Sequence, residues 1–213
     1  MARFLASVSL LVLWAGFAVA QTQSKPPDTE PQRPCVLTVE DYDVYTSVLA
    51  DMWEKDPEGT SRDQTALIYG KTTVPDTPRN DVSGQWFRGE LFRSEAEVLP
   101  SQSTLDNFDQ QIGKPCSLDG TRFKSSHSLE IISADEIENP SKMQSAKWKT
   151  FREKHPGAGF LELSSPGYDP SRTEAVLLVI SHCAGLCGSG ELCLLRKRAG
   201  KWEVKNRLVL WMS

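Results

Sequence analysis

Ten consecutive residues, 181–190, bring together one histidine and two cysteines whose side chains can bind a metal, act as nucleophiles or form a crosslink. The segment reads SHCAGLCGSG, so His182 precedes Cys183 directly and Cys187 follows Cys183 after three residues. In an oxidising compartment, cysteines usually become disulfides. We therefore predict a Cys183–Cys187 disulfide that closes a small ring in a loop between two strands and contributes about 2 kcal/mol by chain entropy.

A metal site is an alternative use of the same segment. His182, Cys183 and Cys187 are residue types that zinc binds at short spacing. However, the sequence has one such cluster and shows no second pair of ligands. Adjacent residues on a strand also point to opposite faces, so His182 and Cys183 diverge unless the chain bends there. The sequence therefore favours the disulfide, and we predict no bound cofactor.

A catalytic nucleophile is the second alternative. Residues 187–190, CGSG, depart from the papain pattern C-G-[SA]-C-[WY] at Gly190, and no histidine follows His182. Gly188 and Gly190 are also not spaced as in a G-x-S-x-G nucleophile elbow, and they suit a tight hairpin. A hydrolase or a thiol oxidoreductase that uses Cys187 or Cys183 with His182 stays open as the enzymatic interpretation.

The three other cysteines lie far apart in the sequence. A Cys35–Cys116 disulfide would close a ring of about eighty residues and contribute roughly 4 to 5 kcal/mol. Cys193 lies between two leucines in a predicted strand, so we expect it to be a buried free thiol. Five cysteines leave one unpaired, and sequence alone does not fix which.

The N-terminus predicts export. Residues 1–20 contain a basic Arg3, an apolar run and an A-x-A cleavage site, as a secretory signal peptide does. Residues 21–34 are polar and proline-rich and are predicted to be a disordered linker before one globular domain, 35–213. No later segment reaches eighteen consecutive apolar residues, so no transmembrane segment is expected after cleavage. The protein is predicted to be secreted or periplasmic.

Hydrophobic periodicity places the cysteine segment within an α+β domain. Helices are predicted at 39–53, 103–112 and 141–155, and strands at 66–69, 86–92 and 129–132. Thr38 and Asp41 resemble a capping box at the start of the first helix, and the apolar residues of that helix recur at helical spacing. From residue 160 on, hairpin turns separate strands at 160–164, 175–180, 192–195 and 202–211, which most simply form a four-stranded antiparallel meander. Helices mostly first and a meander last predict helices that cover one face of the sheet, as in a cystatin-like or NTF2-like roll.

Several motifs in the last third of the chain also support export. They are GFLELS at 159–164, PGY at 166–168, the segment 182–190, GKW at 200–202 and WMS at 211–213. This combination is similar to a family of exported bacterial proteins that share the pattern S-x-P-G-[YF] … C-x-x-x-C-G-x-G … G-x-W … W-x-S. The resemblance implies bacterial origin, export and a shared fold. It implies no activity.

The remaining candidate residues give no catalytic constellation. His127 starts a strand, His155 ends a helix, and Asp135, Glu136 and Glu138 form an acidic stretch that we interpret as solvated. Trp202 and Trp211 fit core positions, whereas Trp86 could form a sugar platform. The basic cluster 196–198 fits a solvated strand end better than a nucleic-acid site. We therefore predict a non-catalytic binding domain whose partner is an envelope or extracellular protein or ligand.

Overall fold

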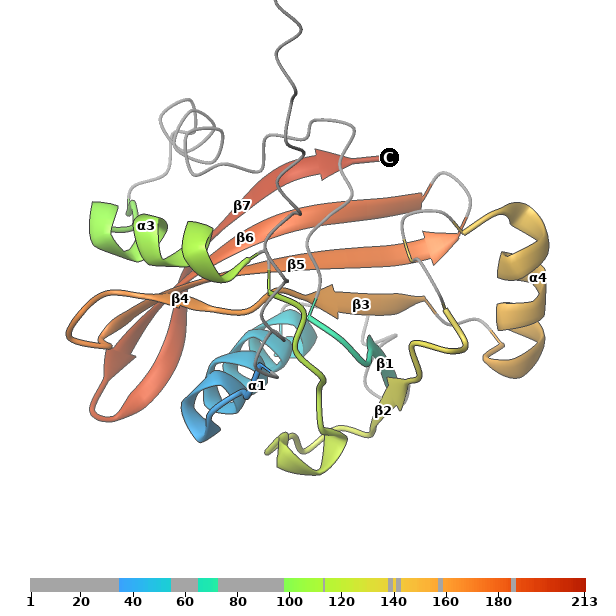
Figure 1. Ribbon diagram of the computed structural model, residues 1–213, viewed down its shortest axis with the longest axis horizontal. Helices are drawn as coiled ribbons and strands as arrows, with labels where there is room; N and C mark the ends of the chain where they lie inside the picture. Colours follow the sequence, from blue (N-terminus) through green and yellow to red (C-terminus); the bar gives the residue numbers. More distant parts are fainter. Residues whose placement is uncertain are drawn as a thin grey trace, which may run out of the picture. The chain divides into compact units, whose positions relative to one another are not determined.

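A mixed β-sheet organises the part of the chain that the structure describes (Figure 1). The computed structural model describes residues 35–54, 65–72, 98–112, 114–137, 140, 143–156, 159–184 and 187–213. The helices are α1 (Val39–Glu54), α3 (Gln102–Gln111) and α4 (Ser145–Lys154), with a short 3-10 helix, η1 (Gly120–Arg122). The strands are β1 (Ala66–Tyr69), β2 (Leu129–Ile132), β3 (Phe160–Leu163), β4 (Gly167–Tyr168), β5 (Glu174–Ala184), β6 (Cys187–Arg198) and β7 (Lys201–Met212).

The strand order confirms the α+β class and the C-terminal meander. The strands follow the order β2-β1-β3-β5-β6-β7, and β4 pairs with β5. The strands β3, β5, β6 and β7 pair antiparallel, as predicted. β1 instead pairs in parallel with both β2 and β3, which makes the sheet mixed. This parallel part could not be predicted from local sequence patterns, because the two strands on either side of β1 come from later segments.

Helix α1 begins at the capping pair that its sequence predicts. The backbone N–H of Thr38 donates to Asp41 Oδ2 over 2.6 Å, and the backbone N–H of Asp41 donates to Thr38 Oγ1 over 3.3 Å. Such reciprocal bonds satisfy donors that a helix start leaves open. The apolar stripe of the helix, which includes Tyr45, Val48 and Leu49, is fully buried against the sheet.

Helices cover both faces of the central strands, so the prediction of a single covered face was wrong. α1 packs in the core that contains Leu177 and Val179, whereas α3 packs in a separate core with Val176 and Leu178. Alternate residues of β5 thus point into opposite cores. The physical reason is the unbroken apolar run 175–180, because a strand that is apolar at every position needs cover on both faces.

Some element boundaries differ from the predicted ones. α4 begins four residues later than predicted, and β5 and β6 extend past their apolar centres because polar hairpin residues also pair. The signal segment 1–20, the linker 21–34 and the predicted strand 86–92, with Trp86, lie outside the described residues. No helix among the described residues is long and apolar enough to cross a membrane.

Candidate functional site

The end of the β5–β6 hairpin carries the cysteine segment, and the predicted disulfide is present there. Cys183 and Cys187 are bonded, with their Cα atoms 5.2 Å apart. The strand register shifts between His182 and Ala184, so the chain bends where the two strands meet. Cys187 is exposed and Cys183 is partly exposed. We call residues 181–184 and 187–190 the hairpin end.

His182 is held by a buried carboxylate that the sequence analysis missed. His182 Nε2 contacts Glu162 Oε1, and the imidazole stacks on the Phe160 ring with the ring centres 4.7 Å apart. The side chains of His182 and Glu162 are 15% and 4% exposed. Glu162 was recognisable in principle, because a carboxylate within the apolar strand 160–163 requires a partner when it is buried. Its partner depends on the β3–β5 register, which the sequence does not show.

The charge of Glu162 also affects a neighbouring strand. Burial, together with the negative charge of Glu162, raises the pKa of the Tyr69 phenol above its usual value. Tyr69 belongs to β1, which pairs with β3. Tyr69 therefore stays neutral at physiological pH. It adds no charge beside the carboxylate of Glu162 and the imidazole of His182.

The bonded sulfurs limit the chemistry of the hairpin end in this oxidised form. Neither Cys183 nor Cys187 is a thiolate, so neither acts as a nucleophile or as a zinc ligand while the disulfide is intact. Among the residues that the structure describes, no group of three or more histidine, cysteine, aspartate or glutamate side chains could hold a metal.

The other two histidines contact different partners. The His127 ring packs at a tilt against Trp53, with the ring centres 4.4 Å apart. His155 follows α4, and its Nε2 lies 3.0 Å from Glu136 Oε1. Part of the acidic stretch that we interpreted as solvated therefore pairs with a helix end.

Helix α4 contacts the hairpin end through one cation. Arg152 Nη2 donates to the carbonyl oxygen of Cys183 over 3.1 Å. Arg152 is exposed on the last turn of α4, while Trp148 and Phe151 of the same helix are buried against Phe160. A positive charge is thus anchored at the residue that carries one of the two bonded sulfurs.

Apolar side chains of β7 lie beside the hairpin end. Met212 is 77% exposed and pairs in register with Ser189, and Val209 is 50% exposed. Trp211 lies over Gly190, where an added Cβ would be 2.3 Å from Trp211 Nε1. The predicted core position of Trp211 is therefore only partly buried, whereas Trp202 is 6% exposed, as a core residue should be.

The second predicted disulfide, Cys35–Cys116, is also present, with its Cα atoms 4.9 Å apart. Cys116 is 1% exposed, although Cys35 is exposed. Cys193 is fully buried in β6 and belongs to neither disulfide, as predicted. The two disulfides therefore differ in burial as well as in ring length.

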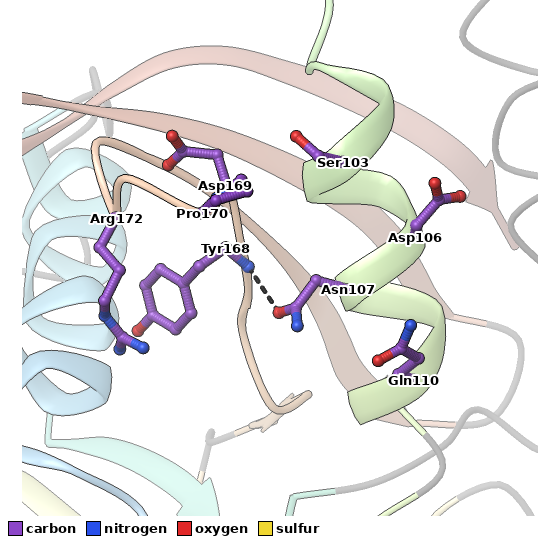
Figure 2. Close-up of a pocket in the computed structure, with 8 residues that line it drawn as sticks. All are labelled: Ser103, Asp106, Asn107, Gln110, Tyr168, Asp169, Pro170 and Arg172. Carbon is purple, nitrogen blue, oxygen red and sulfur yellow. Dashed lines mark hydrogen bonds between the residues drawn. The ribbon is translucent and has the colours of Figure 1, made fainter.

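A polar groove between α3 and the β4–β5 turn was not predicted (Figure 2). Its volume is about 460 Å³, and its walls are formed by Ser103, Asp106, Asn107, Gln110, Tyr168, Asp169, Pro170 and Arg172. The four α3 residues follow helical spacing, i, i+3, i+4 and i+7, which is the signal that could have revealed one wall.

Side chains of this groove are engaged in holding the fold. Asn107 Oδ1 accepts the backbone N–H of Tyr168 over 2.9 Å (Figure 2), and the Tyr168 hydroxyl donates to Asp41 Oδ1 over 2.7 Å. Burial, followed by the charge of Asp41, raises the pKa of Tyr168 well above its usual value. The Arg172 guanidinium covers the Tyr168 ring at 4.0 Å. These contacts fix the walls and give the groove a structural explanation.

Comparison of the chain with protein-family models, with curated proteins and with solved structures gives no match. The function is therefore inferred from the geometry of this chain.

Proposed function

We propose that the protein is an exported, non-catalytic binding domain that contacts a partner protein through the hairpin end and the neighbouring exposed side chains of β7. The observation that carries this proposal is the Cys183–Cys187 disulfide at an exposed end of a long hairpin. A covalent ring of five residues restricts this loop before any partner arrives, and such preorganisation lowers the entropy lost on binding.

The surroundings of the disulfide support a contact surface. Met212 and Val209 provide exposed apolar area next to the hairpin end, while Ser189 and Arg152 provide polar groups. Protein interfaces commonly combine an apolar centre with a polar rim. Methionine also adapts its shape to different partners, because its side chain is unbranched and polarizable.

The oxidised cysteines and the engaged histidine support binding over catalysis. Both sulfurs of the segment are bonded in the disulfide, and His182 Nε2 is hydrogen-bonded to Glu162 Oε1. The enzymatic alternative requires a reactive thiolate at Cys187 or Cys183 in the protein as isolated. Export is supported by the signal-like segment 1–20 and by two disulfides, which persist mainly in oxidising compartments.

Site-specific photocrosslinking tests the proposal. A photoreactive amino acid at Met212 should give a defined crosslinked product with secreted or envelope material from the organism that makes the protein. The matched control is Ser171, which is also exposed but lies in the turn before β5, at the other end of that strand. Equal products from both positions, or no product from Met212, would contradict the proposed surface.

A thiol assay separates the binding domain from the enzyme. In the oxidised protein near pH 7, iodoacetamide should modify neither Cys183 nor Cys187. Rapid modification of Cys187 would favour the thiol enzyme, because reactive cysteines have a low pKa and are accessible.

A further inference from the structure

We propose that Cys183–Cys187 is a thiol-exchange site: a protein dithiol reduces this disulfide in the folded protein by attack on the sulfur of Cys187, while Cys35–Cys116 stays oxidised. The chemical proposal does not depend on the identity of the partner. Its consequence for regulation, a contact surface that changes when the ring opens, rests on the proposed function.

Access for the attacking thiol is available at Cys187. Exchange requires a thiolate to approach one sulfur of the disulfide directly, so the exposure of that residue matters. Cys187 is exposed and is the first residue of β6. Cys35 of the second disulfide is exposed too. Access alone therefore does not separate the two disulfides.

The two disulfides differ in the surroundings of the sulfur that leaves. Attack on Cys187 releases Cys183, which is partly exposed and whose carbonyl oxygen holds the Arg152 guanidinium at 3.1 Å. A nearby cation stabilises a thiolate, and a thiol of lower pKa leaves faster. Attack on Cys35 would instead release Cys116, which is 1% exposed and lies 3.5 Å from the Ser165 hydroxyl and from the Lys114 carbonyl oxygen. A thiolate is unfavourable in such a buried place.

The exchange is balanced between the two dithiols. The first partner thiolate bonds to Cys187 Sγ, the Cys183–Cys187 bond breaks, and its electron pair remains on Cys183 Sγ. The second thiolate of the partner dithiol then attacks the partner's own sulfur that is bonded to Cys187, and Cys187 leaves as a thiolate. Both released thiolates take protons from solvent. The protein disulfide gains two electrons, and the partner dithiol is oxidised to a disulfide.

Cys193 provides an internal reporter of unfolding. It is fully buried in β6 and belongs to neither disulfide, so it reacts with a thiol reagent only when the sheet opens. The oxidised protein would be incubated with increasing dithiothreitol, quenched with N-ethylmaleimide and mapped by peptide mass spectrometry. We expect Cys183 and Cys187 to be modified at least about tenfold faster than Cys35 and Cys116, with Cys193 unmodified.

Two outcomes would overturn the proposal. If Cys193 is modified in step with Cys187, reduction requires unfolding. If Cys35 and Cys116 are modified first or equally fast, the argument from the leaving sulfur is wrong. The role of Arg152 has its own test: Arg152→Gln should slow reduction by roughly threefold, whereas Lys149→Gln, on the same helix, should leave the rate unchanged. Equal rates in both variants would remove Arg152 from the mechanism.

The regulatory consequence is measured separately. The crosslinked product from Met212 should decrease after dithiothreitol treatment that leaves Cys193 unmodified. A product that is insensitive to reduction would refute regulation and leave the binding function standing. Absence of any product would refute the binding function, while the peptide map would still decide the exchange.

Discussion

Removing each disulfide separately should lower the free energy of unfolding by unequal amounts. One double variant is Cys183→Ala with Cys187→Ala, and the other is Cys35→Ala with Cys116→Ala. A crosslink stabilises mainly by restricting the unfolded chain, and its effect grows with the logarithm of ring length. The sequence separations are 4 and 81 residues. They correspond to roughly 2 kcal/mol for the short ring and roughly 4.5 kcal/mol for the long one.

These amounts are compared with a total stability of about 5–15 kcal/mol for a typical domain. The variant without the short ring should therefore stay folded, with Tm lowered by roughly 4–8 °C. The variant without the long ring should lose roughly 9–18 °C. The difference in stability loss between the two variants should be slightly larger still, because Cys116 is 1% exposed and alanine at that position leaves a small cavity.

Calorimetry and guanidinium unfolding, followed by circular dichroism, measure both quantities. Cys193→Ala serves as a control for the loss of a buried thiol without loss of a crosslink. Equal losses in the two double variants, or a larger loss without the short ring, would refute the ring-length reasoning. Such a result would mean that the hairpin disulfide contributes through contacts in the folded state.

Three further predictions concern buried contacts. Glu174→Gln should cost about 2 kcal/mol in chemical unfolding, because it removes the negative charge that strengthens the hydrogen bonds from the backbone N–H of Ser101 and the hydroxyl of Thr104 to Oε1 of residue 174. Arg196→Ala should cost less than about 1 kcal/mol, since the Arg196 side chain is 46% exposed. Burial raises the pKa of Glu174, but the hydrogen bonds that this carboxylate accepts prevail and hold its pKa below the usual value for glutamate. The stabilisation from the carboxylate is therefore complete above that usual pKa and is lost as the pH falls through the lowered pKa. Acid titration of Glu174→Gln should show a shallower loss of stability than that of the wild type, and a parallel curve would contradict this. Gly190→Ala should displace Trp211 and cost about 1–3 kcal/mol, and unchanged tryptophan fluorescence would count against the packing that we describe.

Local signals in the sequence predicted much of the fold. The capping pair and the apolar stripe located α1, and turn residues located the strands of the meander. Both disulfides were also predicted, because an expected oxidising compartment restricts what five cysteines can do. These successes share one property: each depends on residue type and short-range spacing.

The features that could not be predicted from the sequence depend on contacts between segments that are far apart in the chain. β1 pairs in parallel with residues that lie 63 positions later in β2 and 93 positions later in β3, as the register of Ala66 with Leu129 and of Ile68 with Leu161 shows. The partner of His182 is fixed by the β3–β5 register. The helices on both faces follow from the apolar run 175–180, because a strand that is apolar at every position needs cover on both faces.

The pair of Glu162 and His182 has a consequence for tracing the descent of this chain. Substituting one member alone would leave the other, a charged or polar group, mostly buried without its partner. In homologues, residues 162 and 182 should therefore be substituted together, for instance by a pair of aliphatic residues. Correlated substitution of these two residues, which lie twenty positions apart, would identify remote homologues even where overall sequence identity is low.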